Sequence, residues 1–165
     1  MTVIAADRQA DAPRPIVLDT RTSARREMAQ WVEAFAYVWA APRERLDELM
    51  ALLSPDVVLR APTRPPVSRG HAAGRQAFER AFRALPDLRA EIHRWSASGD
   101  VLFVELTFHA TIGGHEVTWD DVDRFLFRDG EAIERVAYFD PAKVRKAFLR
   151  NPRGMLQLFR MRRER

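Results

Sequence analysis

The apolar residues of this chain change their spacing at Pro86. Before Pro86 they recur every three or four positions, which is the spacing of an amphipathic helix, and from Pro86 to Phe139 they alternate, which is the spacing of a half-buried strand. Helices followed by a run of strands predict an α+β fold, with the helices packed on one face of an antiparallel sheet. The 165 residues suffice for one domain with a substantial core.

The helical spacing predicts three helices, and the alternation predicts a meander of strands. The helices are expected at 23–39, where Thr22 or Ser23 can cap the first turn, at 43–53 and at 74–85. A short strand is expected at 57–59, followed by a loop at 63–70, and later strands at 90–96, 101–111, 116–127 and 132–139. Glycine-containing turns at 98–100, 113–114 and 128–130 join the later strands as hairpins.

The two ends of the chain differ in composition from the domain between them. Residues 1–22 show no sustained period and are expected to form a flexible arm. Residues 141–165 carry nine basic side chains and one acidic, a charge of +8 within a total of +4, which leaves −4 for 1–140. The high pI therefore belongs to this tail, and nucleic-acid binding is not expected.

The basic tail is expected to be helical and broken in two at Asn151-Pro152. Its mixture of arginines and large apolar residues fits a weak contact with an anionic membrane surface or with acidic partners. It fits equally a helix packed across the mouth of a pocket or along the edge of a dimer. The sequence leaves these alternatives open.

The chain contains no cysteine, which excludes disulfides and thiolate chemistry. The first fifteen residues contain Asp7 and Asp11 and lack the apolar core of a secretory signal, so a cytoplasmic protein is expected. Its four histidines do not have the spacing of a zinc site, and neither a metal nor a cofactor is expected.

Three segments carry a resemblance to a known family. They are LMALLSPDVVLRAP at 49–62, GRQAFERAF at 74–82 and DDVDRFLFRDGEAIERVAYFDP at 120–141. Their order resembles the nuclear transport factor 2-like superfamily, which includes ketosteroid isomerases, SnoaL-like polyketide cyclases and limonene-epoxide hydrolases. The resemblance implies that residues 23–140 form a cone, in which a curved sheet and three helices enclose a pocket for an apolar small molecule. It also implies a homodimer.

The resemblance assigns site residues one at a time. Against ketosteroid isomerases, Asp123 and Tyr37 are similar to the aspartic acid and tyrosine of the oxyanion hole, whereas the general base falls on Ala61. The acid/base aspartate of the cyclases falls on Ala137. The epoxide hydrolases have an arginine and an aspartate on the first long strand, near 106–110, where only apolar residues of this chain are expected to face the pocket.

Strand alternation places Asp121 and Asp123 on the same face of their strand. If that face lines the pocket, burial raises the pKa of a carboxyl group, and Asp121 can replace the missing base while Asp123 and Tyr37 stabilise an oxyanion. In the alternative interpretation, Asp123 forms a structural ion pair with Arg135 on the next strand. The residues expected to contact the ligand are Trp39, Leu59, Ala61, Leu106, Phe108, Trp119, Phe125, Ala137 and Phe139.

Three arginines near His71, namely Arg60, Arg64 and Arg69, fit either an acidic group at the pocket rim or solvated loop charges. Three functions remain open. The first is an acid/base enzyme, such as an isomerase, cyclase or hydratase, for a steroid-, terpenoid- or polyketide-like substrate. The second is a protein that binds an apolar ligand without turnover, and the third is a dimeric scaffold, which needs no cavity.

Overall fold

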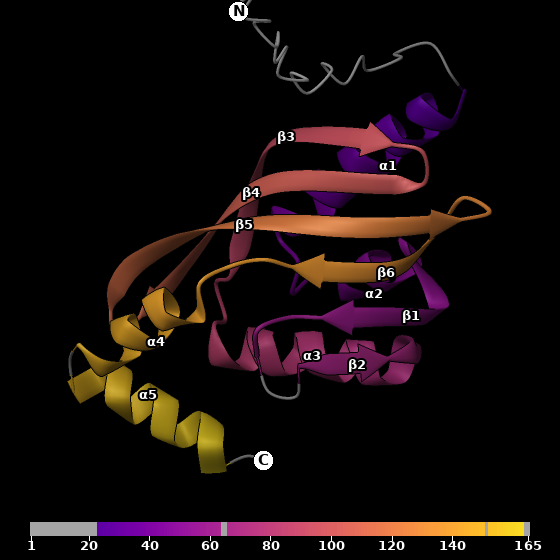
Figure 1. The fold of residues 1–165 in the computed structure, drawn as a ribbon. Coiled ribbons are helices and arrows are strands. Elements are labelled where there is room, and N and C mark those ends of the chain that lie inside the picture. Colours follow the sequence, from indigo (N-terminus) through magenta and orange to yellow (C-terminus); the bar gives the residue numbers. More distant parts are fainter. Residues whose placement is uncertain (1–22, 64–65, 151, 164–165) are drawn as a thin grey trace, which may run out of the picture.

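A six-stranded sheet forms the centre of the protein, and helices cover one of its faces (Figure 1). The structure, a computed structural model, describes residues 23–63, 66–150 and 152–163. Helices α1 (Ser23–Trp39), α2 (Leu46–Ala51) and α3 (Gly70–Ala84) lie behind the sheet in Figure 1. This arrangement confirms the predicted α+β class and the three helices packed on a curved sheet.

The strand order in the sheet is β2-β1-β6-β5-β4-β3. The strands are β1 (Leu53–Arg60), β2 (Val67–Arg69), β3 (Arg89–Ser98), β4 (Val101–Ile112), β5 (His115–Arg128) and β6 (Glu131–Ala137). Strands β3 to β6 form the predicted antiparallel meander. One neighbour differs from the prediction, because β1 joins the sheet parallel to β6. The sheet is therefore mostly, and not wholly, antiparallel.

The first segment after α2 contains more strand than its sequence predicts. Strand β1 begins at Leu53 and includes Pro55, which interrupts the apolar run. The register of β1 against β6 shifts between Leu53 and Val58, around this proline. A register shift of this kind tolerates a proline that cannot donate a hydrogen bond to the ladder. The segment expected to be a loop also contains β2, whose three residues pair only with β1. Short edge strands of this kind lack a strong alternation signal.

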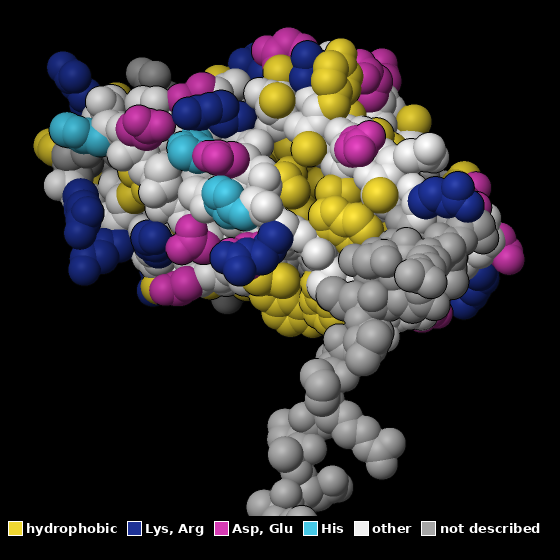
Figure 2. Space-filling view, turned by 90° about the horizontal axis from the view of Figure 1, so that it is seen from above, with side chains coloured by type: hydrophobic (Ala, Val, Ile, Leu, Met, Phe, Trp, Pro, Cys, Tyr) yellow, Lys and Arg dark blue, Asp and Glu magenta, His cyan; other side chains and the backbone are white. Residues whose placement is uncertain are grey.

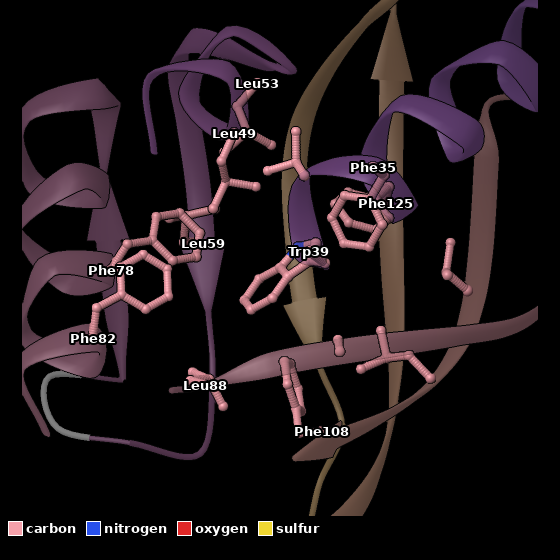
Figure 3. Close-up of a cluster of buried hydrophobic side chains, with 14 of the residues drawn as sticks. Phe35, Trp39, Leu49, Leu53, Leu59, Phe78, Phe82, Leu88, Phe108 and Phe125 are labelled. Atoms are coloured by element: carbon pink, nitrogen blue, oxygen red, sulfur yellow. The ribbon is translucent and has the colours of Figure 1, made fainter. Parts of the chain in front are cut away.

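Helix α1 places one stripe of side chains into the core. Met28, Val32, Phe35 and Trp39 are buried, and their spacings of four, three and four residues are those of a single helix face. Figure 3 shows Phe35 meeting Phe125 of β5, while Trp39 lies across from Phe78 and Phe82 of α3. The core is thus continuous from α1 to α3 and closes against the inner face of the sheet.

The basic tail forms two helices, α4 (Pro141–Leu149) and α5 (Pro152–Arg163), as predicted. Asp140 caps α4 by accepting a hydrogen bond of 2.8 Å from the backbone N–H of Ala142, and Pro141 occupies the first turn. The two helices lie beside the ends of the long strands β4 and β5 (Figure 1). The predicted N-terminal arm, residues 1–22, lies outside the described residues.

The outer face of the sheet carries many charged and polar side chains, with the apolar Phe103 and Val122 exposed among them. It carries the ion pairs Arg94–Glu105 and Arg89–Glu116, and His93 bonds to Thr107, which donates to Asp120. Figure 2, viewed from above, shows basic, acidic and histidine side chains intermixed over the left part of the molecule. Within the described residues, none of the helices combines the length and apolar character needed to cross a bilayer.

Candidate active site

A cavity of about 670 Å³ lies between the inner face of the sheet, α3 and α4. Its volume falls in the range of pockets that bind small organic molecules. Residues of every layer contribute to its wall, including the predicted Trp39, Leu59, Ala61, Phe108, Trp119, Asp121, Ala137 and Phe139. A dimeric scaffold would not need such a cavity.

The deep wall of the cavity is aromatic. The rings of Trp39 and Phe108 lie 5.1 Å apart between centroids, and those of Phe108 and Trp119 lie 5.3 Å apart. Both indole N–H groups, of Trp39 and Trp119, are buried and donate to no described residue. Buried donors without a partner are costly and uncommon, so these two indoles set this wall apart from an ordinary core.

Helix α3 lines the cavity with small side chains. Ala77, Ala81 and Ala84 recur at spacings of four and three residues and so share one face of the helix. Because alanine has no side chain beyond Cβ, this face leaves open the volume that a leucine stripe would fill. The alanines therefore help to explain why a cavity exists between α3 and the sheet.

Among the described residues of the cavity wall, Asp121 is the one carboxylate. Its side chain is only 2% exposed, and its Oδ1 accepts a hydrogen bond of 2.8 Å from the backbone N–H of Tyr138. Its Oδ2 is buried and has no hydrogen-bond partner among the described residues. One oxygen thus orients the carboxylate, while the other has no partner among the described residues.

Asp123 lies two residues further along β5 and is wholly buried. Its Oδ2 is 2.7 Å from Nη2 of Arg135, which is an ion-pair distance, although the contact is not a straight hydrogen bond. The alternative interpretation of the sequence, a structural ion pair with Arg135, describes this contact. Arg135 also reaches the cavity wall, whereas Asp123 does not.

Burial dominates the electrostatics of both carboxyl groups. It raises the pKa of Asp121 to about 6, helped by the neighbouring charge of Asp123 and opposed by the Arg135 guanidinium. Burial also raises the pKa of Asp123, against the effect of its ion pair with Arg135. Asp121 is therefore a stronger base than a solvated aspartate, and it still ionises near neutral pH.

The structure places Tyr37 away from the cavity, and this corrects its predicted position beside Asp123. Its side chain is 56% exposed, and its ring lies under the guanidinium of Arg45. Tyr37 is two positions from both Phe35 and Trp39, which turns it about 200° around the helix from the buried face. Its sequence neighbours belong to the core, but Tyr37 does not.

Two further predicted ligand contacts, Leu106 and Phe125, are buried in the core and do not line the cavity. The predicted alternation assigns them correctly to the inner face, but it cannot tell a filled part of that face from an open part. Of the three arginines near His71, Arg60 lines the cavity and pairs with Glu134 at 3.1 Å, whereas Arg69 does not line it. Arg64 lies outside the described residues.

Two contributions to the cavity wall do not follow from the sequence analysis. Arg135 is predicted only as an ion-pair partner, and the alanines of α3 are not predicted as lining residues. Val144 and Phe148 of α4 also line the cavity, which agrees with the alternative of a tail helix packed across the pocket. The spacing of the alanines was the one available signal for α3. Within the described residues, no three His, Asp or Glu side chains gather as metal ligands would.

The family model of the SnoaL-like domain matches residues 28–135. The fold is similar to a candidate SnoaL-like polyketide cyclase from Jannaschia sp. CCS1, with a TM-score of 0.70, 18% identity, and coverage of 80% of this chain and 98% of that one. It is also similar to an NTF2-like protein of unknown function from Burkholderia pseudomallei K96243, with a TM-score of 0.65, 24% identity and coverage of 73% and 96%.

A third similar structure is an LEH-like epoxide hydrolase from M. tuberculosis. Its TM-score is 0.60 at 26% identity, with coverage of 81% of this chain and 96% of that one. No curated protein matches the sequence. These likenesses cover most of this chain and show its fold.

Proposed function

The chain belongs to the SnoaL-like domain family, and we propose that it is an acid/base enzyme for an apolar, steroid-, terpenoid- or polyketide-like molecule. The reaction is an isomerisation, cyclisation or hydration in which a proton leaves or joins a carbon or oxygen of the substrate. The neighbouring folds of a candidate polyketide cyclase and an epoxide hydrolase support this range of chemistry.

Asp121 acts as the base in this proposal. With a pKa of about 6, roughly nine-tenths of the group is ionised at pH 7. The hydrogen bond from Tyr138 to Oδ1 orients the carboxylate, and Oδ2 takes the substrate proton. A carboxylate held in an apolar wall is a more effective base than a solvated one, because water does not stabilise its charge.

The guanidinium of Arg135 stabilises the negative charge that develops on the substrate oxygen. It lines the cavity, and its Nε is buried without a partner among the described residues, although its Nη2 meets Asp123. A fixed cation in a water-poor site stabilises an enolate or alkoxide without reorganising. In this proposal Asp123 is a positioning residue that holds the guanidinium, a different role from the oxyanion donor expected from the resemblance.

The single observation that carries the proposal is the unpartnered Oδ2 of Asp121 in the wall of an aromatic cavity. The test is to incubate the protein with panels of steroids, terpenoids and aromatic polyketides and to follow substrate and product by mass spectrometry. Asp121→Asn should abolish turnover. The matched control is Asp120→Asn, because Asp120 is the preceding residue and bonds to Thr107 on the outer face.

A second function, ligand binding without turnover, is favoured by Ala61 and Ala137. Both alanines line the cavity at positions where the resemblance expects catalytic aspartates. A compound that shifts the melting temperature of the wild type and is recovered unchanged would support binding alone. Conversion by the wild type and by Asp120→Asn, but not by Asp121→Asn, would establish the enzyme.

A further inference from the structure

The rim of the cavity is cationic. Arg80 and Arg83 of α3 and Arg145 of α4 all line it, and they are more exposed than the buried residues of the deep wall. Arg80 and Arg83 are three positions apart, so they emerge on the same side of α3 as the alanine face. Arg145 follows the cavity-lining Val144 on the facing helix. The cationic rim is defined here as Arg80, Arg83 and Arg145.

These three arginines differ from the other two in the cavity wall, because those two have partners. Arg60 pairs with Glu134 at 3.1 Å, and Arg135 pairs with Asp123 at 2.7 Å. Among the described residues, no carboxylate lies within ion-pair distance of Arg80, Arg83 or Arg145. The cavity therefore presents three uncompensated positive charges at its rim and one carboxylate, Asp121, in its wall.

We infer that the ligand of this cavity is an amphipathic acid, with an apolar body on the aromatic wall and a carboxylate or phosphate group held by the cationic rim. This inference rests on the proposed function and specifies its substrate class. Guanidinium groups suit both acids, because their planar N–H groups match two oxygens at once. The acidic group would lie at the rim, apart from the aromatic wall that contains Asp121.

Two fluorescent dyes can test the inference separately from the cavity itself. Anilinonaphthalene sulfonate and phenylnaphthylamine share their aromatic skeleton, and only the first carries an anionic group. Phenylnaphthylamine reports whether the cavity takes an apolar body, which the proposed function requires. The ratio of the two dissociation constants reports what the rim adds for the anion. Both are measured by fluorescence titration on the full chain at low and at physiological salt.

The test variant is the triple substitution Arg80→Gln, Arg83→Gln and Arg145→Gln. Its control removes the same charge elsewhere, by Arg43→Gln, Arg69→Gln and Arg128→Gln, since these exposed arginines do not line the cavity. We expect the rim variant to bind the sulfonate about tenfold more weakly and the neutral dye unchanged, because exposed charge pairs contribute modestly and additively. The preference for the sulfonate should also decline as salt rises.

The possible results distinguish failure of the acid-binding inference from failure of the proposed function. An unchanged dye ratio in the rim variant, or an equal fall in the control, overturns the acid-binding inference and leaves the proposed function standing. Failure of phenylnaphthylamine to bind the wild type removes the cavity as a ligand site, and both proposals fail with it. Ala81→Phe fills the cavity and should release both dyes, which ties the signals to this site.

Displacement of the bound sulfonate dye distinguishes the two kinds of acid. Decanoate, decyl phosphate and decanol carry the same alkyl chain with a carboxylate, a phosphate or no charge. Stronger displacement by decanoate assigns the rim to carboxylates, and stronger displacement by decyl phosphate assigns it to phosphates. Decanol displacing the dye as well as both acids do would contradict an anionic ligand.

Discussion

The inner face of the sheet has two halves, one closed and one open. In the closed half, Trp31, Phe35, Phe125 and Phe127 pack ring against ring, with centroid distances of 4.6 to 5.3 Å. In the open half, Trp39, Phe108 and Trp119 also lie close together, but the space in front of them is a cavity. Aromatic composition alone does not separate the two halves.

Hydrogen bonding does separate them. The indole N–H of Trp31 in the closed half donates to the backbone carbonyl of Leu52 at 3.0 Å. The indoles of Trp39 and Trp119 and the Oδ2 of Asp121 in the open half are buried without partners among the described residues. A filled core satisfies its polar groups, and a ligand site keeps some of them available. Under the proposed function these three groups would face the ligand, although Asp123, which is buried outside the cavity wall, also has oxygens without a hydrogen-bond partner among the described residues.

The largest expected effect is in the closed half. Phe35→Ala should lower the free energy of unfolding by about 3–5 kcal/mol, because it leaves a void in a fully packed cluster. Phe108→Ala should cost only about 1–2 kcal/mol, since one side of that ring already faces a cavity. Urea denaturation of both variants measures the difference. Equal losses would show that the two halves are packed alike.

Arg135 connects the two halves, because it pairs with buried Asp123 and also reaches the cavity. Arg135→Met should cost about 3 kcal/mol at pH 7.5, since two buried carboxylates lose their cation. Without the guanidinium the pKa of both groups rises further, so the loss should shrink as pH falls and they become protonated. The double variant Asp123→Asn and Arg135→Met should recover part of the stability. No recovery would contradict the ion pair.

Asp121→Asn should stabilise the protein at neutral pH while it removes activity. A carboxyl group whose folded pKa is raised costs nothing below its unfolded value near 4, and its cost grows as pH rises to about 6. The full cost is about 3 kcal/mol by the size of that shift. The variant should therefore gain up to this amount at pH 7.5 and little near pH 4. Asp120→Asn, whose carboxylate is on the outer face, should show no such gain.

The smallest expected change in stability comes from a larger side chain at a position that faces the cavity. Ala81→Leu on the cavity face of α3 should change stability by less than about 1 kcal/mol, because there is room for the new atoms. The same substitution at Ala132, which is fully buried in the closed half, should cost about 1–3 kcal/mol through overpacking. Thermal denaturation of the pair compares the space in the two halves directly.

The periodic parts of this fold follow from the sequence, and the irregular parts do not. Strong alternation predicts β4 and β5 nearly to their ends, and helical spacing predicts α1, because each buries one regular face. The parallel pairing of β1 with β6 and the three-residue β2 are set by long-range contacts. No local spacing encodes such pairings.

The sequence predicts which side chains lie on the inner face of the sheet. It does not predict which of them lie in the open half, beside the cavity. Alternation correctly places Asp121 and Trp119 on the inner face, and both line the cavity. It places Leu106 and Phe125 there with equal force, although neighbouring side chains fill the space around them. The prediction for Tyr37 is wrong for another reason. It rests on the resemblance to ketosteroid isomerases, whereas the geometry of α1 turns this side chain away from the core.

A carbon-detected NMR titration can follow the ionisation of the Asp121 carboxyl group, with its signal assigned by comparison with Asp121→Asn. It is performed on the free protein and on the protein saturated with phenylnaphthylamine. The account predicts a midpoint near pH 6 in the free protein, and a higher one with the dye, which removes the remaining water. A midpoint near 4 in both states would show a solvated carboxylate unaffected by the cavity, and would contradict the account.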